Sequence, residues 1–333
     1  MTTAAQHAAA TDTHHVDVLI AGAGISGVGS AYHLQEQCPD KSYLILEMQD
    51  SFGGTWKTHK YPGVRSDSDL YTFGYRFKPW VGAPIASAEE ILKYMGEVIE
   101  ENGIGEHILY GHRIVRCSWS SDDKLWTVEA TRLADDAPVT VTCNFLWMCQ
   151  GYYDHEKPYI PDWKGMERYQ GDFVHAQLWD PETDYSGKRV LVIGSGATAA
   201  TVIPAFAEKA EHVTMLQRSP TYFFCSENKN ELADRLREVG IDEPTIHRVV
   251  RAQIMYDQDV LTKRCLTEPD VVFDELKELV REFIGQDFEF EPHFVPKYRP
   301  WQQRLAFCPE ADIFKAAVEG KLTVVTDSLE TFT

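Results

Sequence analysis

Hydrophobic positions along the chain form short apolar runs that alternate with longer stretches of helical spacing. Residues 17–21 are apolar, rich in β-forming side chains and followed by glycines, which predicts a buried parallel strand. Residues 25–37 have the pattern of a helix, and residues 43–47 have that of a second strand. This order of strand, helix and strand is a βαβ unit.

The stretch that follows is less regular. Residues 53–84 mix glycine, proline and aromatic residues, as loops do, whereas residues 88–102 place apolar side chains at helical spacing. Three extended segments come next and are separated by turn-forming residues, at 108–119, 126–133 and 139–149. They predict an antiparallel β segment attached to the first βαβ unit.

A second cycle follows a proline-rich linker, with a strand, a helix and a strand expected at 189–193, 197–210 and 212–217. Residues 227–285 have helical periodicity, and a last helix and strand are expected at 312–318 and 322–326. We therefore predict an α/β protein with two Rossmann-like dinucleotide-binding domains. The first contains the antiparallel segment and the second a helical insertion.

The same patterns set the expected domain boundaries. Residues 1–15 are small and polar and are expected to form a disordered tail, although a metal-binding cluster of His7, His14 and His15 is an alternative. The expected parts of the remaining chain are the first domain at 16–165, a linker at 166–187, the second domain at 188–333 and, within it, the insertion at about 227–300.

Charge and cysteine content narrow the class of protein. The chain has 32 basic and 51 acidic side chains and a net charge of −19, which disfavours nucleic acid and anionic membrane surfaces as partners. Its seven cysteines form no C-x-x-C pair, so neither a zinc site nor a redox disulfide is expected. With no signal peptide and no long apolar segment, the chain is expected to be soluble and cytoplasmic.

The first glycine-rich turn fits the dinucleotide fingerprint, with Gly22, Gly24 and Gly27 between a strand and a helix. These glycines permit a tight turn, close approach of a pyrophosphate and close packing of the helix on the sheet. Glu47 ends the next strand, where an acid binds ribose hydroxyls. The alternative is a glycine-rich turn that binds nothing.

The second turn repeats this arrangement with Gly194, Gly196 and Ala199. Its second strand ends at Gln217 and Arg218 with no acid, and an arginine there can hold a 2′-phosphate; Ser219 follows as a further candidate. This site is therefore expected to prefer NADP(H), unless Arg218 is only a surface residue. Two dinucleotide sites imply electron transfer between them, and without a cysteine pair oxygen is the expected acceptor.

Two longer motifs carry a resemblance to a known family. Residues 53–67 fit [AG]-G-x-W-x4-[FY]-P-[GM]-x3-D, and residues 169–180 fit F-x-G-x3-H-x3-W-[PD] except that tyrosine begins the second motif. The second motif places Tyr169, Gly171, His175, Trp179 and Asp180 in the linker. The chain resembles the flavin-dependent monooxygenases of Baeyer–Villiger type, and residues 65–71 and 217–222 resemble most the branch that activates thioamides such as ethionamide.

The resemblance implies FAD in the first domain and NADP(H) in the second. It implies an NADPH- and O2-dependent enzyme that converts a ketone into an ester or lactone and also oxygenates sulfides or thioamides through a flavin (hydro)peroxide. The residues expected to bind cofactors are Gly22, Gly24, Gly27, Glu47, Gly54, Trp56, Asp67, Tyr71, Gly194, Gly196, Ala199, Arg218 and Ser219.

In that family an arginine late in the second domain stabilises the anionic flavin peroxide and pairs with the fingerprint aspartate. The matching residues here are Arg304 and Asp67, which are therefore the expected catalytic residues. The alternatives are a structural ion pair for Arg304 and a turn or cap for Asp67. Gln303 stands where the family often has lysine, and His175 is expected to be a hydrogen-bonded hinge rather than a general base.

Members of this family continue well past the strand expected at 322–326 and return to the first domain. The sequence is therefore expected to be a C-terminally truncated monooxygenase. The alternative is an FAD- and NADP-binding remnant that is inactive or that oxidises NADPH and releases hydrogen peroxide.

Overall fold

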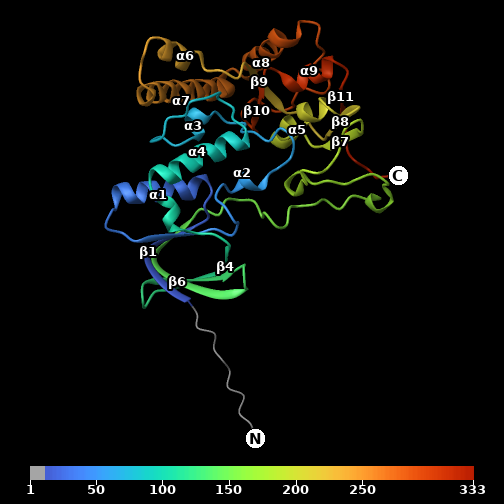
Figure 1. The fold of residues 1–333 in the computed structure, drawn as a ribbon. Coiled ribbons are helices and arrows are strands. Elements are labelled where there is room, and N and C mark those ends of the chain that lie inside the picture. The colour runs from blue at the N-terminus through green and yellow to red at the C-terminus, as the bar shows by residue number, and fades with distance from the viewer. Residues whose placement is uncertain (1–11) are drawn as a thin grey trace. The chain divides into compact units, whose positions relative to one another are not determined.

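The computed structural model describes residues 12–333, which form two compact units. The first unit comprises residues 12–58 and 91–155, and the second comprises residues 59–90 and 156–333. Residues 59–90 follow the first βαβ unit in sequence, yet their contacts lie with the second unit. The expected boundary at residue 165 therefore differs from this division. Figure 1 shows the elements of both units.

The first unit is built on a six-stranded sheet of order β3-β2-β1-β6-β5-β4. Its strands are β1 (Asp12–Ala21), β2 (Tyr43–Leu46), β3 (Ile108–Leu109), β4 (His112–Ser120), β5 (Leu125–Arg132) and β6 (Ala137–Met148). The pairs β1–β2, β1–β6 and β2–β3 are parallel, whereas β4, β5 and β6 form the expected antiparallel segment. Alternate residues of β5 and β6 are buried and pack against Leu19 and Leu46.

Strand β1 begins earlier than the sequence pattern indicates. Its residues 12–16 pair with residues 139–143 of the long strand β6, and the side chains of His15 and Thr142 share a hydrogen bond of 2.9 Å. The expectation of a disordered tail is therefore wrong for residues 12–15, because β6 offers backbone partners to polar residues that have no strand pattern of their own. The rest of that tail, residues 1–11 with His7, lies outside the described residues.

Helices connect the strands of the first unit. Helix α1 (Ile25–Gln37) joins β1 to β2, and α4 (Ala88–Glu101) and the short helix η1 (Ile104–His107) precede β3. The loop-rich stretch after β2 contains two single-turn helices, α2 (Thr55–Thr58) and α3 (Leu70–Phe73), the second of which belongs to the second unit.

The second unit contains a parallel three-stranded sheet of order β11-β8-β7. Its elements are β7 (Arg189–Ile193), α5 (Ala197–Ala207), β8 (His212–Gln217), α9 (Asp312–Val318) and β11 (Leu322–Thr326). A separate parallel pair consists of β9 (Tyr222–Ser226) and β10 (Leu305–Pro309). This pair was not expected from the sequence, because its two strands are short and separated by the whole insertion.

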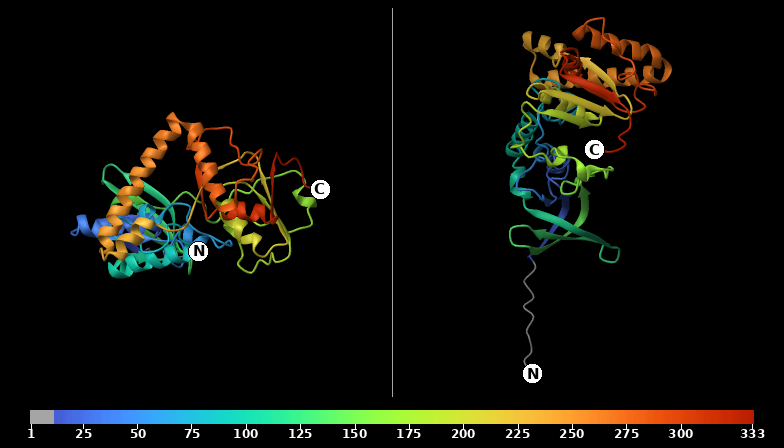
Figure 2. Two further views of the ribbon diagram at one scale, coloured as in Figure 1. Left: turned by 90° about the horizontal axis from the view of Figure 1, so that it is seen from above. Right: turned by 90° about the vertical axis from the view of Figure 1, so that its right-hand side faces the viewer.

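The helical insertion lies between β9 and β10 and comprises α6 (Glu231–Glu238), α7 (Glu243–Thr267) and α8 (Pro269–Ile284). Side chains of Asn230 and Asp242 cap the first two of these helices. Helices α7 and α8 meet in a V (Figure 2). Two further short helices in the linker are η2 (Met166–Arg168) and η3 (Ala176–Leu178).

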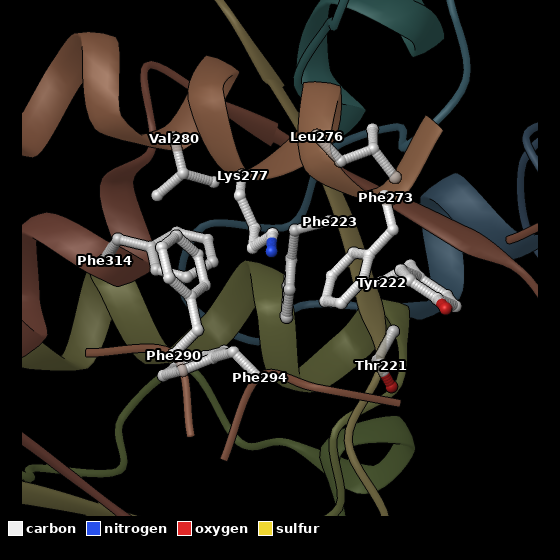
Figure 3. A pocket seen from close by; sticks show the side chains of 10 residues that line it. All are labelled: Thr221, Tyr222, Phe223, Phe273, Leu276, Lys277, Val280, Phe290, Phe294 and Phe314. Atoms are coloured by element: carbon white, nitrogen blue, oxygen red, sulfur yellow. The ribbon is translucent and has the colours of Figure 1, made fainter. Parts of the chain in front are cut away.

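Aromatic rings fill the core of the second unit. Phe314 on α9 is 1% exposed, and its ring lies 4.8 Å from that of Phe294 and 5.3 Å from that of Phe223. Beside this cluster is a hollow between α8 and β9, into which Lys277 extends (Figure 3). Its ammonium lies 4.7 Å from the centre of the Phe273 ring. Six of the ten residues that line the hollow are aromatic, so we interpret it as a gap between packed rings rather than as a polar binding site.

Replacing Phe314 by alanine should destabilise the second unit by about 3–5 kcal/mol, because the change removes a buried ring and leaves a cavity. Urea denaturation followed by fluorescence and circular dichroism measures this loss. Val318→Ala on the same helix is the matched control: Val318 is 56% exposed, so its loss should lie within about 0.5 kcal/mol of zero. Equal losses in the two variants would contradict the assigned core.

Candidate dinucleotide sites and the Asp67–Arg304 pair

The first glycine-rich turn is closed by backbone contacts that leave no room for side chains. A Cβ atom at Gly27 would lie 1.9 Å from the carbonyl oxygen of Gly22, and one at Gly22 would lie 2.8 Å from that of Cys149. Gly22 also has a φ of +102°, which side chains of L-residues rarely adopt. The close packing of α1 on the strand therefore requires these two glycines.

Glu47 faces this turn from the end of β2. It is 6% exposed, and its carboxylate accepts hydrogen bonds from the backbone N–H of Ala23 at 2.7 Å and of Gln49 at 2.8 Å. These bonds fix a buried carboxylate beside the glycine-rich turn, at the position where a ribose-binding acid is expected.

The helices that follow both turns begin without competing anions. Helix α1 is capped by Gly24 and helix α5 by Gly196, neither cap supplies a side-chain hydrogen bond, and neither first turn contains an acid. The first N–H groups and the positive end of each helix dipole are therefore available to phosphate.

The start of the long fingerprint packs against the first turn. A Cβ atom at Gly54 would lie 3.2 Å from the Cα atom of Gly24, and the N–H of Gly53 donates to the carbonyl of Ala23. Trp56 lies in α2 directly after this contact and is half-buried. The structure therefore brings Gly54 and Trp56 to the candidate FAD residues Gly22, Gly24, Gly27 and Glu47.

The second turn has the same hydrogen-bond frame but more open space. Gly194 donates to the carbonyl of Leu216, as Gly22 does to that of Leu46. A Cβ atom at Gly194 or Gly196 would meet nothing within 4 Å, although Gly194 has a φ of +127°. Ala199, at the third position of the motif, is 5% exposed and packs in the core of the second unit.

This shared frame makes Gln217 the structural counterpart of Glu47. Gln217 is 1% exposed and turns its amide away from the glycines, donating to the carbonyl of His293 and to the hydroxyl of Thr326. No carboxylate therefore occupies the ribose position of the second turn. The next residues, Arg218 and Ser219, are exposed at the end of β8, where they can meet an anionic group.

Asp67 and Arg304 form an ion pair, although 237 positions separate them in the sequence. The Asp67 side chain is 22% exposed and that of Arg304 is 53% exposed. The surrounding fingerprint segment is fixed in the same unit. Arg65 donates to Asp312 at 2.8 Å, and a Cβ atom at Gly63 would lie 3.0 Å from the carbonyl oxygen of Thr201 in α5.

Tyr71 is buried and contacts the helical insertion. It is 1% exposed, burial raises the pKa of its hydroxyl, and that hydroxyl accepts a hydrogen bond from Arg237 at 3.1 Å. This burial is typical of a packing residue, and cofactor binding by Tyr71 stays a prediction.

The short fingerprint lies in the second unit and has mostly structural contacts. Trp179 packs on Phe206 of α5, with ring centres 5.5 Å apart, and Asp180 accepts a hydrogen bond from the N–H of Glu182. His175 accepts a hydrogen bond from the N–H of Gln177 and thereby caps η3. Tyr169 and Gly171 are exposed. The hinge role of His175 stays a prediction.

Sequence reasoning missed the residues of α7 that hold the loop after Tyr71. Arg251 donates to the carbonyls of Tyr71 and Thr72 at 2.8 Å each. His247 is 2% exposed, accepts from the N–H of Trp80 and donates to the carbonyl of Tyr75. Burial lowers the pKa of His247, so the imidazole is neutral in this arrangement. Arg251 and His247 appear in the sequence only as polar residues of a helix, and nothing in that pattern indicates contacts with residues 71–80.

The described part of the chain offers neither a metal cluster nor a membrane-spanning helix. Residues 12–333 contain no group of three or more His, Cys, Asp or Glu residues placed to hold a metal ion. Within the same residues, no helix is both long and apolar enough to cross a membrane.

Comparison with known proteins adds independent information on the whole chain. The profile of the NAD(P)-binding Rossmann-like domain matches residues 20–80, and that of the flavin-binding monooxygenase-like family matches residues 85–231. The chain is 42% identical over 323 residues to the FAD-containing monooxygenase EthA of Mycobacterium tuberculosis and 41% identical to EthA of Mycolicibacterium smegmatis. Each alignment covers 96% of this chain and 65% of the relative.

Solved structures show the same fold. Cyclohexanone monooxygenase matches with a TM-score of 0.70 at 20% identity, covering 94% of this chain and 66% of that protein. Steroid monooxygenase bound to NADP matches with a TM-score of 0.70 at 22% identity, covering 94% and 65%. The chain thus spans about 65% of the length of its curated relatives. Residues 85–231 thus match the flavin-binding monooxygenase-like family, and the chain as a whole, with its Rossmann-like fold, is similar to FAD-containing monooxygenases.

Proposed function

We propose that this chain binds FAD at the first glycine-rich turn and NADP(H) at the second and acts as an NADPH- and O2-dependent monooxygenase. Its proposed substrates are small ketones, converted into esters or lactones, and also sulfides or thioamides. The observation that carries this proposal is the ion pair between Asp67 and Arg304 in the unit that contains the second turn. The names of the relatives, FAD-containing monooxygenases, support it.

The first site fits the diphosphate and ribose of FAD. The backbone at Gly24 lies at the start of α1, where N–H groups point toward a bound anion. A carboxylate has about four acceptor positions, and the backbone N–H groups of Ala23 and Gln49 use two of those of Glu47. The others would accept hydrogen bonds from ribose hydroxyls.

The second site fits NADP(H) better than NAD(H). Gln217 is neutral and faces away from the turn, so no carboxylate repels a 2′-phosphate. Arg218 keeps its positive charge at any physiological pH and can bind a phosphate through two parallel hydrogen bonds. Ser219 adds a hydroxyl next to it.

Together, the bound flavin and nicotinamide would supply the two electrons that reduce O2 during monooxygenation. The role of this chain is to place a fixed cation beside that chemistry. Arg304 would stabilise negative charge that develops during the reaction. Asp67 would orient the guanidinium through their ion pair. The charges of Asp67 and Arg304 cancel, so the pair is neutral as a whole. The attraction between them offsets part of the conformational entropy that the Arg304 side chain loses when it is held in one position.

We further propose that the protein works in the cytoplasm. All seven of its cysteines are free, as expected in a reducing compartment.

Gly27→Ala should abolish FAD binding, because the added Cβ would push α1 away from the turn that holds the phosphates. The absorbance of the purified chain titrated with FAD measures this. Gly105→Ala is the matched control in the same unit, since its Cβ would meet only Ile99 at an ordinary 3.5 Å. A colourless wild-type chain would favour the inactive remnant instead.

Arg218→Ala should raise the KM for NADPH by about ten-fold or more and leave that for NADH nearly unchanged, because only NADPH carries the 2′-phosphate. Steady-state kinetics with both nucleotides measure the difference. Arg189→Ala, which removes an exposed arginine from the opposite end of the sheet, is the control. Equal effects on the two nucleotides would remove Arg218 from 2′-phosphate recognition.

Arg304→Ala should abolish ester formation from cyclohexanone while NADPH still reduces the flavin, because the cation is needed only after reduction. Product chromatography and anaerobic flavin bleaching separate these steps, with the exposed Lys297→Ala as control. Ester formation at the wild-type rate would exclude Arg304 from the mechanism. NADPH oxidation by the wild type that yields only hydrogen peroxide would favour the uncoupled oxidase.

A further inference from the structure

Arg304 lies at the end of a loop, residues 299–304, that has no regular secondary structure. Its side chain is half exposed, so the burial of its own surface does not fix it. The middle of the loop is held by Trp301, whose indole N–H donates to the hydroxyl of Thr262 in α7 at 2.6 Å. Its two ends must be held as well if the guanidinium is to meet Asp67 reproducibly.

Both ends of this loop are held by Tyr222, the first residue of β9. At the far end, Leu305 directly follows Arg304 and is the ladder partner of Tyr222 in the β9–β10 pair. At the near end, the Tyr222 hydroxyl donates to the backbone carbonyl of Tyr298 at 2.5 Å. One residue thus closes the loop through its backbone on one side and its side chain on the other.

A second hydrogen bond and a ring contact join Tyr298 to the residues at the start of β9. The Tyr298 hydroxyl donates to the carbonyl of Pro220 at 3.2 Å, and the two rings meet edge to face with centres 5.4 Å apart. Tyr222 is 5% exposed, and burial raises its pKa to about 12, so its hydroxyl stays a donor at neutral pH. In Figure 3 this hydroxyl points away from the aromatic hollow, while the ring faces Phe273.

The same strand start is tied to the second glycine-rich turn. Thr221 donates to the carbonyl of Ser195, and the Ser195 hydroxyl contacts the carbonyl of Ser219 at 3.2 Å. Residues 219–222 therefore form one hydrogen-bonded connection between the candidate phosphate-binding residues and the loop that carries Arg304.

We propose that Tyr222 is a positioning residue that closes the loop 299–304 and thereby presents Arg304 to Asp67 and to the dinucleotide at the second turn. The part concerning the dinucleotide rests on the proposed NADP(H) site. The part concerning Arg304 and its loop rests on contacts within the chain alone.

The first experiment needs no cofactor. Tyr222→Phe keeps the ring and the β9–β10 ladder but removes the hydroxyl that donates to Tyr298. Hydrogen–deuterium exchange of the free chain should show amides in peptides covering 299–304 exchanging about five-fold faster, the factor that corresponds to one lost hydrogen bond. Tyr298→Phe, which removes the longer bond to the Pro220 carbonyl, should give a smaller change in the same peptides.

Tyr43→Phe is the matched control for this experiment. Tyr43 is also buried and its pKa is also raised to about 12, but its hydroxyl has no hydrogen-bond partner in the described part of the chain. It should leave exchange at 299–304 unchanged. Unchanged exchange there in Tyr222→Phe would overturn the proposal.

The second experiment tests whether Tyr222 acts through Arg304. Isothermal titration with NADP+ gives the Kd of the wild type, Tyr222→Phe, Arg304→Ala and the double variant. Tyr222→Phe should raise the Kd about five-fold alone and cause no further rise once Arg304 is alanine. An equal rise in both backgrounds would overturn the link to Arg304. A wild type that binds no NADP+ would refute the proposed second site, while the exchange experiment still decides the position of the loop.

Discussion

The ion pair between Asp67 and Arg304 depends on a prior constraint, which is the attachment of residues 59–90 to the second unit. Arg65 reaches Asp312 at the start of α9, Gly63 lies against α5, and Arg251 binds the backbone carbonyls that follow Tyr71. Without these contacts Asp67 would belong to a free loop, and a half-exposed ion pair stabilises too little to order such a loop by itself. The candidate catalytic pair is therefore a consequence of a larger, mostly buried interface within one unit.

The sequence predicted the parts of the fold that depend on local pattern. Both βαβ units, the antiparallel segment and the helical insertion follow from apolar runs, helical spacing and glycines at two turns. The position of Glu47 was also predictable, because an acid at the end of the second strand is placed beside the turn, whereas its ribose-binding role stays a prediction. Its buried carboxylate does lie beside the first turn.

What could not be predicted depends on partners that are far away in the sequence. Residues 12–15 are polar and extend β1 only because β6 is long enough to pair with them. Strands β9 and β10 are short, and the whole insertion separates them in the sequence. The hydrogen bonds from Tyr222 to the Tyr298 carbonyl and from Tyr298 to the Pro220 carbonyl also join residues that are far apart in the sequence. The long fingerprint predicted a pair between Asp67 and Arg304. It did not indicate that the segment around Asp67 packs in the second unit.

The two glycine-rich turns also differ in what keeps their glycines in place. At Gly27 the protein's own backbone forbids any larger residue, so natural selection would remove a substitution there through misfolding alone. At Gly196 the backbone angles are ordinary and the space beside the Cα atom is empty. An alanine at 196 would meet no atom of the protein within 4 Å, so folding alone does not demand glycine there. Under the proposed function, a pyrophosphate at this turn would be the constraint on position 196, which would then report nucleotide use rather than folding.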